Sequence, residues 1–274
     1  MANTVRRVAV VSDIHFDAHH RAGWAAFVEW HRREVPDEVV FLGDFVDFGM
    51  LSRYVQSVGA PVKAIPQIQL FVREANRIAR RGSVVTVQEG NHDERWGRAL
   101  GLNPVAFEGA LGLTLHDQCL RHGLDEAIQW RREGKRHTAH RVGPFYLRHG
   151  HNQAGRFGGA IHIAANRLRK SNGRSEVVGH HHRAQLHAST CDGETVVGIA
   201  NPCLTEDHDY AVSPDWQRGF TLIETFGPRE RFATAFPIIM ADEGSFAYGG
   251  HHYDGPALVR AAARKLTRDR ARAR

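Results

Sequence analysis

Short apolar runs alternate with stretches of helical periodicity in the first part of the chain. The predicted strands span residues 5–11, 38–42 and 84–88. Between and after them apolar residues recur at helical spacing, and the predicted helices lie around 24–35, 66–81, 95–100 and 104–111. Strands that alternate with helices of this length predict parallel βαβ units with helices on both faces of a sheet.

The second part of the chain has closer-spaced strand patterns. Short strands are predicted at 145–148 and 176–178, and a helix at 158–170. Further strands, separated by turn residues and predicted to be antiparallel, follow at 185–190, 195–200, 220–225 and 232–236. We find no internal repeat or linker, so residues 1–255 are predicted to form one domain. Loop insertions are predicted at about 52–65 and 112–143, and a basic tail at 256–274.

Asp, Asn or His residues, all potential metal ligands, directly follow five predicted strands. They are Asp13 and His15, Asp44 and Asp47, Asn91 and His92, His149, and then His180 and His182. Strand-end loops of a sheet open onto one edge, where ligands of α/β proteins bind, so these side chains can converge. Each also has a simpler interpretation: Asp13 or Asn91 could cap a helix, Asp44 could close a turn, and His149 could be structural. Five such positions in sequence order favour a common site.

The donor atoms of this set are nitrogen and oxygen. Such donors suit Mn, Fe, Zn or Ni, and they argue against a cysteine-rich structural zinc site. The candidate ligands are too numerous for one ion. A carboxylate between two metals ~3.5–4 Å apart would use them all and leave room for a bridging hydroxide, which suits in-line attack at phosphorus.

The same residues resemble the signature of a known family. Asp13-Ile14-His15, Gly43-Asp44-Phe45-Val46-Asp47, Gly90-Asn91-His92-Asp93, His149-Gly150 and Gly179-His180-His181-His182 resemble the five motifs of the calcineurin-like metallophosphoesterase superfamily. The resemblance implies an α/β fold, a four-layer αββα sandwich with two mixed β-sheets packed face to face between helices. It also implies a metal-dependent phosphoric ester hydrolase with two divalent metal ions, of which Mn is the first choice.

The resemblance also implies roles for individual residues. Asp13, His15, Asp44 and His182 match the ligands of one metal, with Asp44 bridging, and Asn91, His149 and His180 match those of the second. His92 faces the substrate in the family pattern, and Asp47 is placed to orient it. An Asp that holds one ring nitrogen raises the basicity of the other, so His92 could bind a phosphoryl oxygen or protonate the leaving group. His151 and His181 are taken as bystanders.

Two departures from the family pattern bear on the substrate. In the Ser/Thr protein phosphatase branch, arginines that contribute to phosphate binding occupy the places held here by Phe48 and Glu89. The absence of two guanidinium groups, each a bidentate donor, weakens binding of a dianionic monoester and favours a monoanionic diester. Arg95 and Arg148 could restore some positive charge for substrate binding, or could pair with neighbouring acids.

These features favour a phosphodiesterase that acts on nucleotides or nucleic acid. The enzymatic alternative is a phosphomonoesterase, and the non-enzymatic one is an interaction scaffold that keeps the fold. Residues 201–204 with 216–220 resemble phage and prophage members of the superfamily. Within them Trp216 could stack on a base or belong to the core.

Charge and composition add expectations about location and partners. The 36 basic and 30 acidic residues give a net charge of +6, and the tail beyond Gly255 alone carries +6, so residues 1–255 are formally neutral. This tail could hold nucleic acid or be a solvated terminus. Cys119, Cys191 and Cys203 lack metal-ligand spacing and indicate a reduced, cytoplasmic setting. No apolar run is long enough for a membrane span, and the sequence does not indicate an oligomeric state.

Overall fold

The first large sheet has six strands. The computed structural model describes residues 5–52, 63–101, 112–131, 139–151, 162–207 and 215–272. In spatial order the sheet contains β11 (Phe232–Ile239), β10 (Gly219–Phe226), β1 (Arg6–Val11), β2 (Glu38–Leu42), β3 (Val84–Gln88) and β4 (Gln129–Arg131). β1 to β4 are parallel, as the alternation of strands and helices predicts, whereas β10 is antiparallel to β1 and β11 to β10.

The second large sheet has five strands and is also mixed. Its spatial order is β5 (His140–Val142), β6 (Phe145–Arg148), β7 (Glu176–Val178), β9 (Glu194–Ala200) and β8 (Gln185–Cys191). β6, β7 and β9 are parallel, and the β8–β9 and β5–β6 pairs are antiparallel. A small hairpin of β12 (Phe246–Tyr248) and β13 (His251–Tyr253) lies outside both sheets.

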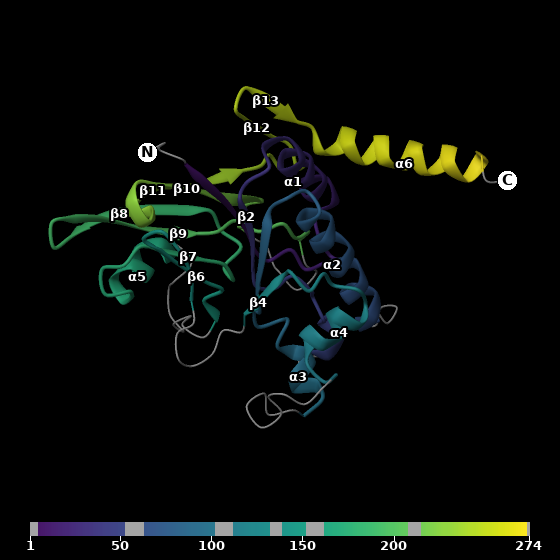
Figure 1. Cartoon of the computed structure of the whole chain (residues 1–274), viewed down its shortest axis with the longest axis horizontal. Coiled ribbons are helices and arrows are strands. Elements are labelled where there is room, and N and C mark those ends of the chain that lie inside the picture. Colours follow the sequence, from purple (N-terminus) through teal and green to yellow (C-terminus); the bar gives the residue numbers. More distant parts are fainter. Residues whose placement is uncertain are drawn as a thin grey trace.

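Six α-helices occur among the described residues, and those that pack on the two sheets cover their outer faces. The six are α1 (Arg21–Glu34), α2 (Ala64–Ala79), α3 (Arg95–Ala99), α4 (Leu115–Arg121), α5 (Ile163–Lys170) and α6 (Gly255–Arg272), with short 3-10 turns at Gly49–Leu51 and Pro228–Glu230. Figure 1 shows α1 and α2 on one side of the strands and α5 on the other. Among these helices, none combines the length and the apolar character needed to cross a membrane.

The core divides into layers because side chains alternate along each strand. On β1, Ala9 and Val11 face the helices, in a cluster with Trp24 and Phe27 of α1. Val8 and Val10 point the other way and belong to the cluster between the sheets. Ile163 of α5 packs on the outer face of the second sheet. Helix, sheet, sheet and helix therefore follow one another, which confirms the predicted four-layer αββα fold.

A buried carboxylate also joins the two sheets. Glu38 on β2 lies 2.8 Å from His140 Nε2 on β5, and Arg6 on β1 donates to it at 2.6 Å. Burial raises the pKa of Glu38, but the hydrogen bond and charge of His140 hold it below the ordinary value. This polar contact fixes one sheet against the other within the apolar interlayer.

Two predicted irregular regions carry regular structure. The stretch 112–143, expected to be a loop insertion, contains α4, β4 and β5, because strands of three residues give no periodic signal. The C-terminal segment, for which no helix is predicted, forms α6 and extends away from the body in Figure 1. Residues 53–62 and the predicted helix at 104–111 lie outside the described residues, as does the start of the predicted helix at 158–170.

Candidate metal centre

The loops after β1 and β2 continue to pair beyond the strands, which brings their polar residues together. Asp13 N–H donates to the Gly43 carbonyl, and Ile14 and His15 N–H both donate to that of Asp44, each at 3.0 Å. From the second sheet, His180 N–H donates to the Asp13 carboxylate at 2.9 Å. Ligand candidates from both sheets thus meet at one edge of the sandwich.

Five of the seven predicted metal ligands adopt a left-handed backbone conformation. Their φ angles are 52° for Asp13, 51° for His15, 52° for Asp44, 71° for His180 and 58° for His182. For residues other than glycine this conformation costs about 1–3 kcal/mol, and it persists only where the surrounding structure imposes it. Strain concentrated on these residues marks the loops as a functional region.

The side chains form three overlapping groups whose potential ligand atoms lie within 4.8 Å of one another. These are Asp13, His15 and His182; His15, Asp44 and His92; and Asp44, His149 and His180. Their donor atoms are carboxylate oxygens and imidazole nitrogens, which fit a divalent transition metal. Asp44 occurs in two groups and is buried between them, so it is placed to serve two ions.

The hydrogen bonds of His149 leave one ring nitrogen for a metal. Its Nδ1 lies 2.9 Å from the Leu42 carbonyl, which can only accept, so Nδ1 carries a hydrogen. Nε2 lies 3.2 Å from Asp44 Oδ2 and 3.1 Å from Asn91 Oδ1. Burial alone would lower the pKa of His149, but the Asp44 and Asp13 carboxylates raise it to about 10. The raised pKa means that Nε2 also carries a proton, and a cation that binds Nε2 must displace it.

Two other ligand candidates, His180 and Asp13, are held in the protonation states that metals require. Burial and the charge of His149 lower the pKa of His180 to about 3, so its ring is neutral near pH 7. Burial opposes ionisation of Asp13, but His182 and His149 outweigh it and hold the pKa of Asp13 below its ordinary value. Neutral imidazoles and ionised carboxylates are the forms that coordinate metals.

His92 belongs to one of the three groups of potential ligands, but its ring is bonded differently from those of the predicted ligands. Its Nδ1 lies 2.8 Å from the Asp47 carbonyl and 3.2 Å from Asp47 Oδ1, so Nδ1 carries the hydrogen. Arg95 Nη2, which can only donate, lies 2.9 Å from Nε2. Asp47 also lies 3.3 Å from His15 Nδ1. The Asp47–His92 pair is formed as predicted, and Arg95 covers the nitrogen that would face a substrate.

Comparison with known proteins identifies the family. The model of the calcineurin-like phosphoesterase family matches residues 6–193, which is more than half of the chain and contains all of the candidate ligands. The chain belongs to the calcineurin-like phosphoesterase family. No curated protein matches it by sequence.

Solved structures with low sequence identity resemble the chain. Vacuolar protein sorting 29 from Cryptosporidium parvum is 14% identical, with a TM-score of 0.45 over 90% of this chain and 94% of that one. Chaetomium thermophilum Vps29 is 10% identical, with a TM-score of 0.37 over 85% and 97%. The protein TT1561 of Thermus thermophilus is 10% identical, with a TM-score of 0.35 over 85% and 99%.

One residue that organises the candidate metal centre, Asp93, is not among the predicted site residues. Asp93 accepts backbone N–H bonds from Asp44 at 2.8 Å, Gly90 at 2.7 Å and Val46 at 3.2 Å. It thereby joins the loop after β2 to the loop after β3. Burial and the Asp44 carboxylate raise the pKa of Asp93 well above its ordinary value. Its position beside His92 in the Gly-Asn-His-Asp motif was the available signal.

The two arginines predicted to bind substrate are placed differently around the candidate metal centre. Arg95 lies against His92, whereas Arg148 Nε lies 3.1 Å from the buried Glu176, which also binds Arg167. Arg148 therefore forms the ion pair that is the alternative to substrate binding. Phe48 is fully buried, and Glu89 accepts a hydrogen bond from Trp130 at 2.7 Å.

Two histidines that are not predicted to be ligands lie beside the candidate metal centre. His151 Nε2 lies 3.2 Å from Glu94, and its ring centroid is 5.4 Å from that of His149. The His181 ring is 5.3 Å from that of His180. Neither occurs in the three groups of potential ligands among the described residues.

Proposed function

We propose that the chain is a metal-dependent phosphodiesterase with two divalent ions, Mn²⁺ being the first candidate. Asp13, His15, Asp44 and His182 would hold one ion, and Asn91, His149 and His180 would hold the other, with Asp44 shared. The observation that carries this proposal is that the buried Asp44 lies within ligand distance of His15 on one side and of His149 and His180 on the other. The ions would supply a nucleophile at neutral pH and polarise the phosphoryl group.

The proposed role of His92 is to bind a phosphoryl oxygen or protonate the leaving group. Asp47 orients the ring by accepting from Nδ1, which leaves Nε2 to face the substrate. Arg95 must leave Nε2 before a substrate oxygen can reach it. Its guanidinium would then be within reach of the same phosphoryl group, which supports a substrate-binding role for Arg95.

The arginine content of the site supports a diester rather than a monoester. Phe48 is buried in the core, Glu89 is acidic, and Arg148 pairs with Glu176. Of these four positions, Arg95 alone places a positive charge beside His92. A diester carries one negative charge and a monoester two near neutral pH. A site with less positive charge therefore favours the diester.

A nucleotide substrate is supported by the aromatic side chain beside the site. Trp216 is half-buried, and its ring centroid lies 4.3 Å from that of His182 in an edge-on contact. A nucleobase that stacks on Trp216 would lie next to the metal held by His182. Base–aromatic stacking contributes about 1–3 kcal/mol per base and tolerates any base. We therefore infer nucleotide or nucleic-acid diesters as the substrate class.

A direct test compares two chromogenic substrates. Protein purified without chelator is assayed with Mn²⁺ on bis-(p-nitrophenyl) phosphate and on p-nitrophenyl phosphate, before and after chelation, and its metal content is measured. We expect two ions per chain, hydrolysis of the diester and loss of turnover on chelation. Preference for the monoester would indicate the phosphatase alternative, and two ions without turnover of either ester would indicate a scaffold.

Variants separate the proposed roles of the site residues. His92→Ala should keep both metals and lower turnover by ~10²–10⁴, the usual contribution of a positioned acid or base. Asp47→Asn should show part of that loss. The control is His187→Ala, since His187 is exposed on β8, away from the ligand groups. Loss of a metal in His92→Ala would contradict the proposed role of His92.

A further inference from the structure

The C-terminal helix is a basic arm on an otherwise neutral molecule. α6 begins against α1, where Gly255 approaches the Ala22 carbonyl, and then extends away from the body (Figure 1). Every described side chain from Arg260 to Arg270 is exposed. The net charge of +6 resides beyond Gly255, so this exposed helix carries the positive field of the chain.

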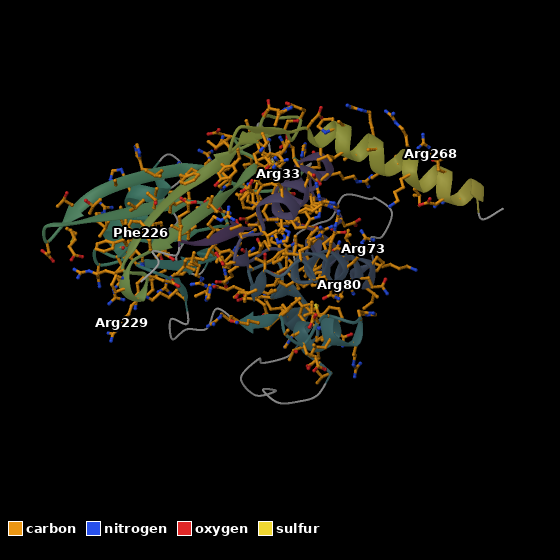
Figure 2. All side chains as sticks on the ribbon, turned by 45° about the horizontal axis from the view of Figure 1, so that its top comes forward. Arg33, Arg73, Arg80, Phe226, Arg229 and Arg268 are labelled. Carbon is orange, nitrogen blue, oxygen red and sulfur yellow. The ribbon has the colours of Figure 1, made fainter. Side chains whose placement is uncertain are left out.

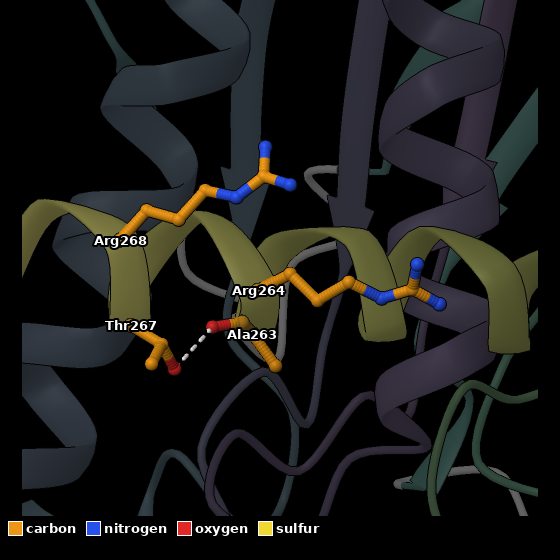
Figure 3. A pocket seen from close by; sticks show the side chains of 4 residues that line it. All are labelled: Ala263, Arg264, Thr267 and Arg268. Atoms are coloured by element: carbon orange, nitrogen blue, oxygen red, sulfur yellow. Dashed lines mark hydrogen bonds between the residues drawn. The ribbon is translucent and has the colours of Figure 1, made fainter.

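Three arginines lie in one row along the arm. Arg260, Arg264 and Arg268 are four residues apart, so they share a face of the helix and follow one another at steps of ~6 Å. Figure 3 shows Arg264 and Arg268 extending the same way beside a shallow hollow that Ala263 and Thr267 complete. Within the described part of the chain, no carboxylate forms an ion pair with these three arginines.

The opposite face of the arm helps to identify the partner. Beyond Val259 it carries Ala262, Leu266, Asp269 and Arg270, and Leu266, which is 54% exposed, is its one large apolar side chain there. A helix that enters a membrane surface needs an apolar face with large side chains, and this one lacks it. A row of guanidinium groups without carboxylate partners, on a helix without such a face, instead fits the regularly spaced charges of a phosphate backbone.

We propose that α6 is a nucleic-acid-binding arm whose row of Arg260, Arg264 and Arg268 contacts the phosphates of a polynucleotide. The contacts are with the backbone, so binding is independent of base sequence. The proposal does not depend on the metal centre, because none of the residues that line the hollow belongs to it. A polynucleotide held on α6 would be retained near the body without contributing to the chemical step.

The test uses the full chain and a charge-matched control. In the row variant, Arg260→Gln, Arg264→Gln and Arg268→Gln are combined. The control combines Arg169→Gln, Lys170→Gln and Arg229→Gln, which remove the same charge from exposed positions. Arg169 and Lys170 are on α5 across the sandwich, and Arg229 lies at the opposite end of the molecule from Arg268 (Figure 2). Circular dichroism checks that both variants keep their helix content.

Binding of a short fluorescent single-stranded DNA is measured by anisotropy over a salt titration. Each phosphate contact to a single strand contributes about −0.7 to the slope of log K against log salt, so the row variant should have a slope shallower by about 2. We expect ~10-fold or greater weakening at low salt for the row variant, and wild-type behaviour for the control.

Four outcomes would overturn the proposal. Superimposable slopes for the wild type and the row variant would exclude the row as a contact surface. Equal weakening in the control would show a non-specific charge effect. Equally tight binding of polyglutamate would indicate a general affinity for polyanions, and preferential binding of anionic vesicles would indicate a membrane surface. Hydrolysis of a small diester should be unchanged in the row variant whether or not the proposed function is correct.

Discussion

Two glycines bring the backbone of the strand-end loops against the side chains of the metal centre. A Cβ atom on Gly90 would lie 2.3 Å from Asp44 Oδ1 and 2.9 Å from His149 Cδ2. At Gly43, whose φ is +84°, it would lie 2.4 Å from His149 Nδ1. Both positions exclude a side chain because Asp44 and His149 fill the space. Glycine at positions 43 and 90 is therefore required for the observed arrangement of Asp44 and His149.

Replacement of Gly90 by alanine should therefore weaken metal binding. The added methyl group must displace Asp44 or His149, and displacement of groups that orient metal ligands typically costs 10–100-fold in affinity, so we expect a loss of about that size. Titration calorimetry with Mn²⁺ on Gly90→Ala measures it. The control is Gly97→Ala in α3, where no atom lies within 4 Å of the added Cβ. Wild-type affinity in Gly90→Ala would show that the loop can shift to accommodate the methyl group without displacing Asp44 or His149.

Individual side-chain roles were predictable where a motif fixes them and less so where a partner comes from elsewhere. The resemblance to the family motifs predicts the contact between Asp47 and His92, which the structure contains. The ion pair of Arg148 involves Glu176, which lies on the neighbouring strand β7. The position of Arg95 against Nε2 of His92 depends on the first turn of α3, whose geometry the sequence pattern does not specify.

At the scale of elements, the strands that bear the site were predictable because they are buried and flanked by polar clusters. The predicted strands at 38–42, 84–88 and 145–148 match β2, β3 and β6 residue for residue. The pattern does not reveal the three-residue strands β4 and β5, which depend on pairing with distant neighbours. α6 was not predicted because its apolar positions at Leu258, Ala262 and Leu266 are followed only by charged residues, Thr267 and Ala271, and its alanines and arginines favour a helix through intrinsic propensity.

The packing of α1 on the loops before β2 and β3 should make stability depend on pH. His31 is buried on α1, and its Nε2 lies 2.8 Å from Ser83 Oγ, which donates to the Pro36 carbonyl. Burial, followed by the charges of Arg81 and Arg77, lowers the pKa of His31 to about 4. Between pH 6.5 and 4 the unfolded chain binds a proton that the folded chain does not, so this histidine should cost about 1–3 kcal/mol of stability as pH falls.

Denaturant unfolding at pH 7 and pH 5 measures this dependence. His31→Gln should lose less stability between the two pH values than the wild type, even if it is less stable at pH 7. His252→Gln, at an exposed position of β13, serves as the control and should behave like the wild type. An equal loss in all three proteins would mean that other groups dominate the acid sensitivity.

At the scale of the whole molecule, the candidate metal centre joins the two sheets. Asp13, His15 and Asp44 follow strands of the first sheet, and His149 and His182 follow strands of the second. Ions shared between these residues would connect the sheets at one edge of the sandwich. At another place in the interlayer, the Glu38–His140 contact also joins them. Separation of the sheets would have to break both connections.

Metal binding should consequently stabilise the whole fold. An ion at 100 times its Kd adds about 2.7 kcal/mol to the stability of the folded state, which corresponds to a rise in Tm of roughly 5–10 °C for a domain of this size. Differential scanning fluorimetry with Mn²⁺ or with chelator measures the change. His149→Ala should reduce the rise, whereas His92→Ala should keep it. An unchanged Tm in the wild type across these conditions would contradict a site that connects the sheets.

The antiparallel pairing of β10 with β1 also affects how the chain folds during synthesis. The strands that bear the site and all of its candidate ligands have left the ribosome once His182 has emerged, but β10 is made later. Until then β1 is an edge strand, and the apolar run from Val8 to Val11 offers unpaired backbone groups to other chains. The nascent protein is therefore most prone to misassociation after the part that bears the candidate metal centre has been translated, and release of residues 219–226 ends that interval.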